Sequence, residues 1–176
     1  MKAADLKKCL SQMTNAELID LVCKLSKNSK EVQSMLDVEF GGSEAEDKLV
    51  LECKEKIKKE ILGKKLSLKN AKKVISDFKK VCRDKENYAE LLLYYVECGM
   101  SLIKQYGDIY EAFYTSMENT FGSFVKEINK FPDDRYYQNV SDRIEDIIKA
   151  AKYYALDLIP YEWAPEIRWR PNDDEE

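Results

Sequence analysis

The first 131 residues of the chain contain no proline, because the four prolines stand at positions 132, 160, 165 and 171. Proline breaks helices, so a long proline-free stretch with few glycines leaves room for long helices. Apolar residues recur at three- and four-residue spacing in these stretches, and the clearest run is Ala71, Val74, Ile75, Phe78, Val81 and Cys82. These features predict an all-α fold of about eight helices without strands.

Several helix boundaries follow from local signals. Thr14 with Glu17 three residues later forms a capping box, so a helix is expected to begin there after a short first helix. A third short helix should end at Gly41-Gly42, and a fourth should run to Gly63. The apolar run LLLYYV at 91–96 predicts that the helix from 84 to 105 is buried nearly all round at the centre of the fold.

The expected organisation is one all-helical domain over 1–160, with short helices over 1–40 and the main helical hairpins over 44–160. Residues 161–176 are expected to form an extended tail. Consecutive helices joined by short turns pack antiparallel, which fits either a short solenoid of stacked hairpins or an irregular bundle. The sequence shows no repeat of fixed period that would decide between them.

Composition excludes several classes of protein. The chain is 44% hydrophobic and 35% charged, with a net charge of -4, and has no apolar run long enough to span a membrane. Its beginning does not resemble a secretory signal, so a cytoplasmic location is expected. Histidine is absent, which removes the commonest general base and zinc ligand. We therefore expect no catalytic residues, no metal and no cofactor, and five cysteines without a C-x-x-C pair should be reduced thiols.

Four stretches carry a family resemblance: LKKCLSQMTNAELIDLV, KNSKEVQSML, SLKNAKKVISDFKKV and LLLYYVECGMSLIKQYGDIYEAFYTSMENTF. Together they resemble a bacterial family of uncharacterised proteins, the domain-of-unknown-function family six-one-five-five, from about Leu6 to about Leu158. The resemblance implies an all-helical protein and supplies no catalytic residues. The alternating hairpins also look like tetratricopeptide-like segments, which implies a binding scaffold.

Charge is distributed unevenly along the chain. Residues 54–85 have a formal balance of +9, whereas residues 1–53 have -3 and residues 86–176 have -10. Lysines on and just before one helix could bind nucleic acid or another polyanion without sequence preference. These candidates are Lys64, Lys65, Lys69, Lys72, Lys73 and Lys80. A solvated lysine face explains the same residues and is favoured, and opposite-charge docking of two copies is a third interpretation.

Aromatic residues concentrate in the second half, where 17 of the 19 lie between Tyr88 and Trp169. Tyrosines off the main apolar stripes, near carboxylates such as Glu97, suit a groove for a peptide partner. Two tail tryptophans should pack on the chain's own helices or on a partner. The candidates are Tyr94, Tyr110, Tyr114, Tyr153, Trp163 and Trp169. The function expected is a non-enzymatic protein-interaction scaffold with an unidentified protein partner or a second copy, and nucleic acid is the alternative.

Overall fold

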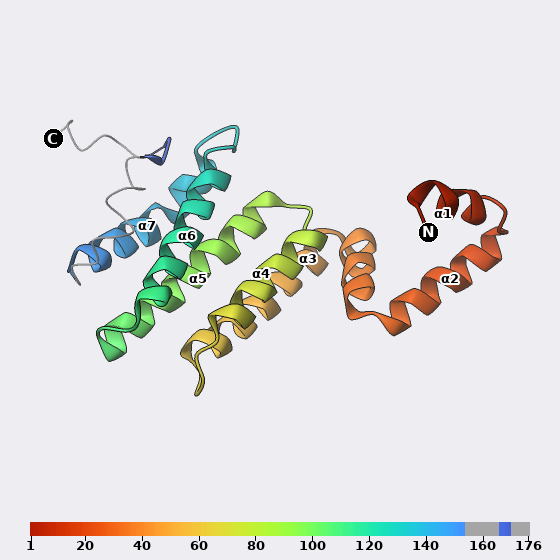
Figure 1. The fold of residues 1–176 in the computed structure, drawn as a ribbon. Coiled ribbons are helices and arrows are strands. Elements are labelled where there is room, and N and C mark those ends of the chain that lie inside the picture. Colours follow the sequence, from red (N-terminus) through yellow and green to blue (C-terminus); the bar gives the residue numbers. More distant parts are fainter. Residues whose placement is uncertain (154–165, 170–176) are drawn as a thin grey trace. The chain divides into compact units, whose positions relative to one another are not determined.

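The computed structural model describes residues 1–153 and 166–169, and seven α-helices are the regular elements in these ranges (Figure 1). They are α1 (Ala3–Leu10), α2 (Asn15–Asn28), α3 (Lys30–Leu62), α4 (Leu68–Val81), α5 (Lys85–Tyr106), α6 (Glu111–Ile128) and α7 (Arg135–Tyr153). The all-α prediction is confirmed, with no strand in the described ranges. None of the described helices has the length and apolar character needed to cross a membrane.

The helix count differs from the expected eight because the predicted third and fourth helices join as α3. The expected break is present within it as a kink, where Gly42 has φ 64° and ψ -152°. A residue with a side chain rarely adopts such a conformation, so the glycine permits the kink. The chain divides shortly afterwards into two compact units, Met1–Glu46 and Asp47–Glu176, and each is described by itself.

The first unit contains α1, α2 and the beginning of α3. The predicted capping box is present at the start of α2, because the backbone N–H of Glu17 donates to Thr14 Oγ1 at 3.3 Å. In return the backbone N–H of Thr14 donates to the Glu17 carboxylate at 2.7 Å. Neither α1 nor α2 buries a residue. The helices are therefore set by local signals, and their apolar side chains contribute little to a core.

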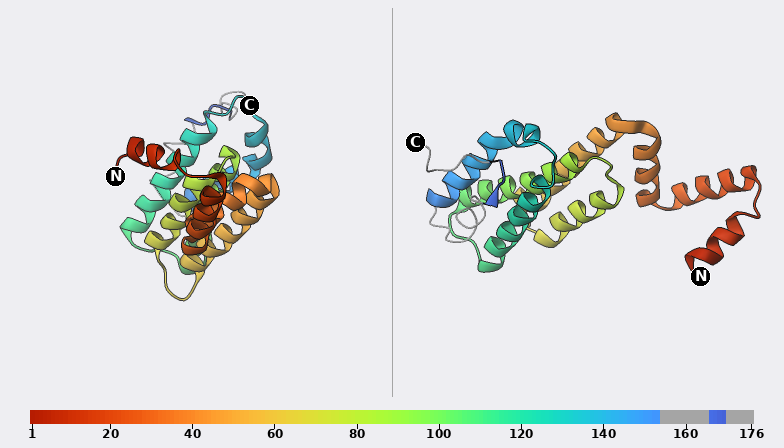
Figure 2. Two further views of the ribbon diagram at one scale, coloured as in Figure 1. Left: turned by 90° about the vertical axis from the view of Figure 1, so that its right-hand side faces the viewer. Right: turned by 90° about the horizontal axis from the view of Figure 1, so that it is seen from above.

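The second unit is built around α5, which has eleven buried residues and packs against α4, α6 and α7 (Figures 1 and 2). This confirms the prediction of a central helix buried nearly all round. Because α7 returns to α5 instead of extending a linear stack, the unit is an irregular bundle. Its core also includes Ile57 and Ile61 from the second part of α3.

A close approach of α5 and α6 depends on Gly99. A Cβ built at this position would overlap the Sδ of Met117, which belongs to α6. The absence of a side chain at 99 therefore lets Met117, which is fully buried, lie directly against the backbone of the central helix.

Candidate functional site

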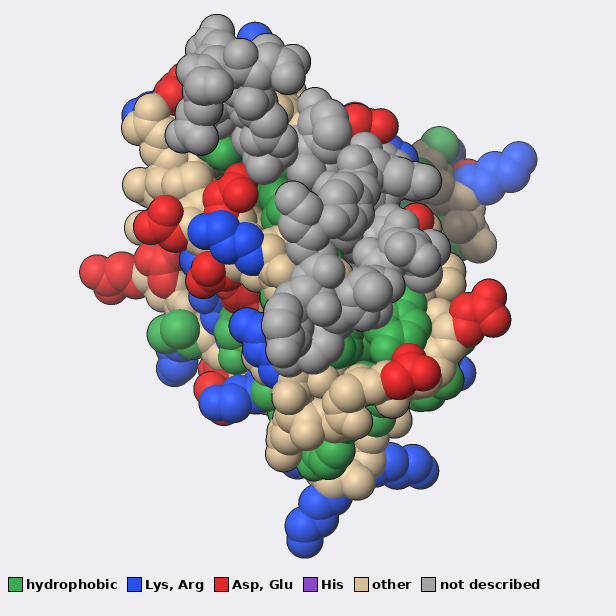
Figure 3. Space-filling model, turned by 90° about the vertical axis from the view of Figure 1, so that its left-hand side faces the viewer, with side chains coloured by type: hydrophobic (Ala, Val, Ile, Leu, Met, Phe, Trp, Pro, Cys, Tyr) green, Lys and Arg blue, Asp and Glu red, His purple; other side chains and the backbone are tan. Residues whose placement is uncertain are grey.

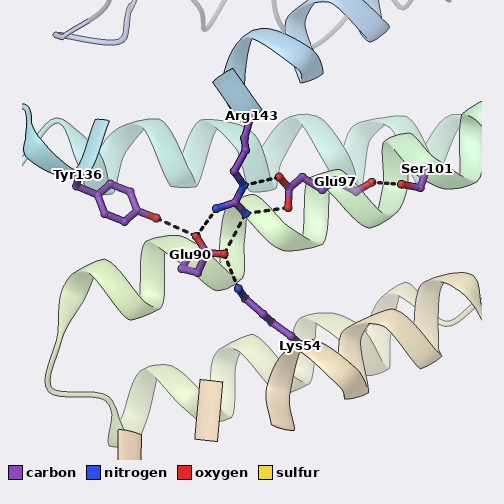
Figure 4. Close-up of polar contacts among 6 residues, drawn as sticks. All are labelled: Lys54, Glu90, Glu97, Ser101, Tyr136 and Arg143. Carbon is purple, nitrogen blue, oxygen red and sulfur yellow. Dashed lines mark hydrogen bonds and ion pairs between the residues drawn. The ribbon is translucent and has the colours of Figure 1, made fainter. Parts of the chain in front are cut away.

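A polar cluster joins three helices of the second unit, and Arg143 of α7 lies at its centre (Figure 4). The Arg143 guanidinium donates from Nε and Nη2 to the two carboxylate oxygens of Glu97, at 2.7 and 2.8 Å. It also donates from Nη1 and Nη2 to the carboxylate of Glu90, at 2.8 and 2.9 Å. Lys54 of α3 contributes a further ion pair, because its Nζ lies 2.6 Å from Glu90 Oε1. We call these four residues the Arg143 cluster.

The Arg143 cluster shifts the pKa values of Glu90 and Arg143. Burial by itself would raise the pKa of Glu90, but hydrogen bonds and charge from Arg143 and Lys54 outweigh it, so the pKa lies below its usual value. The hydrogen bonds that Arg143 donates to Glu97 and Glu90 raise the pKa of Arg143. Burial raises the pKa of Tyr136, whose hydroxyl lies 3.5 Å from Glu90 Oε2. The Glu90 carboxylate is therefore ionised and Tyr136 is neutral near pH 7.

Two cations and two carboxylates balance each other in the Arg143 cluster, and the guanidinium is shared by two bidentate contacts. This geometry holds α7 and α3 on α5, because the ion pairs join side chains from all three helices. Within the described ranges there is no group of three or more carboxylate or thiol side chains that could hold a metal ion. We therefore interpret the cluster as a structural connection between helices. No pattern in the sequence singles out Arg143.

The tyrosine candidates occupy separate places. Tyr94 is half-buried on α5, with the Lys54 ammonium 5.3 Å from its ring centroid. Tyr114 is buried, and its hydroxyl donates to Asp108 at 2.7 Å and accepts from the backbone N–H of Ile109 at 2.9 Å. Tyr110 is exposed at the beginning of α6 and packs edge-on against Phe113. Tyr114 thus braces the turn before α6, whereas Tyr94 faces α3.

The remaining aromatic candidates lie near or beyond the end of α7. Tyr153 is the last residue of α7, but its side chain and Trp163 lie outside the described residues. Trp169 is partly buried and packs against the core of the second unit. The turn that carries it is attached to Asn129, whose side-chain amide donates to the Glu166 carbonyl at 2.7 Å and accepts from the Arg168 N–H at 2.9 Å.

The lysine candidates lie on α4 and the loop before it, and all six are exposed. They are Lys64, Lys65, Lys69, Lys72, Lys73 and Lys80. Lys80 pairs with Asp77 at 3.0 Å. Phe78 on the same helix is buried, so it offers no surface on which a base could stack. On the face beside α7, basic and acidic side chains are interspersed instead of forming an area of one sign (Figure 3).

A surface pocket of about 270 Å³ lies between α4, α5 and α6. We call it the α4–α6 pocket. It combines two lysines, several neutral polar side chains and an apolar floor. The lining residues are Lys72, Ile75, Ser76, Lys79, Tyr88, Leu92, Asn119, Thr120 and Ser123. Of the sequence candidates only Lys72 belongs to it.

The first unit exposes large apolar side chains. Ile19 on α2 is 62% exposed and Phe40 on α3 is 83% exposed. Others on the same helices also face solvent, namely Val22, Leu25 and Met35. We call these five side chains the N-terminal apolar surface. Met1 and Leu6 of the same unit are exposed as well, and α1 and α2 bury no residue, so large apolar side chains are unusually frequent on the surface of this unit.

Comparison with known proteins gives one family. Residues 1–155 match the model of a family described as "Family of unknown function (DUF6155)". No curated protein matches the chain, and no solved structure matches it.

Proposed function

The chain belongs to this family of unknown function, and because membership assigns no activity, we propose from the structure that the protein is a helical protein-interaction scaffold. The interface is the N-terminal apolar surface, and the partner is a second copy of the chain. The observation that carries the proposal is the exposure of Ile19 and Phe40 in a unit whose α1 and α2 bury no residue. A unit of 46 residues has little core of its own, and association is a common way to complete one.

Charge within the first unit favours a second copy as the partner. Residues 1–30 contain six lysines and three acidic residues, a balance of +3, whereas residues 31–46 contain five acidic residues and no basic one, a balance of -5. In a two-fold dimer the same surface is used by both chains, so the basic segment of one copy can face the acidic segment of the other. Apolar side chains are present on both segments and would fill the contact between them.

Light scattering coupled to size-exclusion chromatography tests this proposal with the full chain. We expect the wild-type protein to be a dimer and the double variant Ile19→Glu/Phe40→Glu to be a monomer, because two charges cannot be buried in an apolar contact. Leu51→Glu is the matched control, since Leu51 is 63% exposed but lies in the second unit. It should remain dimeric. Circular dichroism should show the same helix content in all three proteins.

Three outcomes refute the proposal. One is a monomeric wild-type protein at 100 µM or more, on the order of the concentrations at which weak but specific homodimers form. Another is a dimer whose mass is unaffected by the double variant, which would place the contact on another surface. Equal loss of the dimer in the Leu51→Glu control would also refute it.

A further inference from the structure

The α4–α6 pocket is assembled from regularly spaced residues on three helices. Lys72, Ser76 and Lys79 follow one face of α4 at positions i, i+4 and i+7, which brings their side chains to the same side of the helix. Opposite them, α5 contributes Tyr88 and Leu92, again four residues apart. The third wall is the stretch of α6 from 119 to 123. The pocket therefore lies on rigid elements of the second unit and not on a loop.

The floor and the rim of the pocket differ in polarity. Ile75 and Leu92 are almost completely buried and form the apolar floor together with Thr120, whose hydroxyl donates to the Ser116 carbonyl at 2.8 Å. The rim is polar, because Ser76, Asn119 and Ser123 are exposed there. An apolar floor with a few polar groups around it is typical of small-molecule sites.

The two pocket lysines differ from neighbouring lysines in their partners. Within the described ranges, Lys72 and Lys79 form no ion pair with a carboxylate, whereas Lys80 pairs with Asp77 and Lys130 pairs with Glu127, each at 3.0 Å. Lys79 instead lies over the ring of Tyr88, with its ammonium 4.6 Å from the ring centroid. Among the described residues, the two lysines at the pocket rim therefore have no ion-paired carboxylate.

We propose that the α4–α6 pocket binds a small organic anion, with its phosphate or carboxylate between Lys72 and Lys79 and its apolar body on Ile75 and Leu92. Lysine ammonium groups bind anions as point charges, and the side chains of Ser76, Asn119 and Tyr88 can donate neutral hydrogen bonds to the same group. The pocket volume of about 270 Å³ limits the ligand to a small molecule and is too small for a protein segment of any length.

The electrostatics of the two lysines agree with this site. Partial burial lowers the pKa of Lys72, because the ammonium loses some of its water without gaining a counter-ion. The hydrogen bond with Tyr88 raises the pKa of Lys79. A bound anion would supply the counter-ion that Lys72 lacks.

Nuclear magnetic resonance titration of the full chain with phenyl phosphate tests the proposal. We expect backbone amide shifts confined to the pocket walls, around 72–79, 88–92 and 119–123. Inorganic phosphate, which lacks an apolar body, and benzyl alcohol, which lacks the charge, should each bind at least about tenfold more weakly. Lys72→Met/Lys79→Met should weaken phenyl phosphate binding at least about tenfold.

Lys69→Met/Lys73→Met is the matched control, because it removes the same charge from the same helix outside the pocket. It should change the affinity by less than about twofold. Equal weakening by both double variants, or shifts spread over all the lysines of 64–80, would show general attraction to a basic face and overturn the proposal. So would equal binding of benzyl alcohol, which would indicate an apolar site without an anion requirement.

Discussion

Replacing Arg143 by methionine tests whether the Arg143 cluster holds α7 on α5. The substitution keeps most of the aliphatic volume and removes four hydrogen bonds of 2.7 to 2.9 Å to Glu90 and Glu97. Glu90 keeps its ion pair with Lys54, but both bonds from Arg143 to Glu97 are lost. Two carboxylates on one face of α5 then face each other without the guanidinium between them, so the second unit should lose stability.

The expected loss is about 2–3 kcal/mol in the free energy of unfolding. Removing one partner of a fully buried ion pair costs about 3–5 kcal/mol, because a charge is left without compensation. Here the side chains of Glu90, Glu97 and Arg143 are 16%, 27% and 33% exposed. Water can therefore partly solvate the two carboxylates that lose the guanidinium, which reduces the cost. For a unit of this size, a loss in that range corresponds to a fall in Tm of about 10 °C.

Urea unfolding followed by circular dichroism at several pH values measures the effect. The folded-state pKa of Glu90 lies below its unfolded value, so its contribution is present above the unfolded pKa, about 4.3 for glutamate, and is lost as the pH falls through the folded pKa. The difference between wild type and Arg143→Met should therefore be largest near neutral pH and should narrow below about pH 4.

Two further variants distinguish the loss of the Arg143 ion pairs from nonspecific destabilisation by a substitution on α7. Arg135→Met removes an exposed pair with Asp133, at 2.8 Å, and should leave the urea midpoint unchanged. Adding Glu97→Gln to Arg143→Met should recover part of the loss, because the uncompensated carboxylate becomes neutral. A loss below about 1 kcal/mol at pH 7, or one that is the same at about pH 7 and about pH 3, would refute the reasoning.

Two other predictions concern packing in the second unit. Gly99→Ala should destabilise it by about 1–3 kcal/mol in urea unfolding, because the new Cβ overlaps Met117, and Gly99→Ala/Met117→Ala should be less destabilised than the two single losses added together. If the loss in the double variant equals the sum of the two single losses, the two positions do not contact each other. Asn129→Ala should release the turn at 166–169 and shift the fluorescence of Trp169 to longer wavelength, measured in a Trp163→Phe background that leaves one tryptophan. An unchanged spectrum would show that Asn129 does not hold the turn.

The helices could be predicted because the signals that form them are local. The capping box of Thr14 and Glu17, the amphipathic stripe of α4 and the apolar content of α5 are each visible within one helix length. The kink at Gly42 was predictable only in its position. The sequence places the break correctly, but whether the chain turns or continues as one bent helix depends on the φ and ψ of a single residue.

The polar connections were not predictable in the same way, because their partners are distant in sequence. Arg143 lies 46 residues from Glu97 and 53 from Glu90, on a helix face that reads as ordinary solvated surface. A signal was nevertheless present. Glu90 and Glu97 are seven residues apart on one face of α5, within its mostly apolar and buried stretch from Ala89 to Ile103. Two such carboxylates require a cation from a packed neighbour. The α4–α6 pocket was even harder to predict, because its walls come from three different helices.

The second unit buries its apolar side chains, whereas the first unit exposes many of its own. The proposed dimer surface and the proposed anion pocket therefore lie in different units. Among the described residues, those of the main hydrophobic cluster lie between Val50 and Ile167, all within the second unit. The first unit buries no residue of α1 or α2 and leaves Ile19 and Phe40 at the surface. Substitutions in a binding surface disturb folding least where no hydrophobic core lies beneath it. A pocket for a small anion, in contrast, requires rigid walls. Self-association should therefore respond to substitutions before residue 47 and anion binding to those after it.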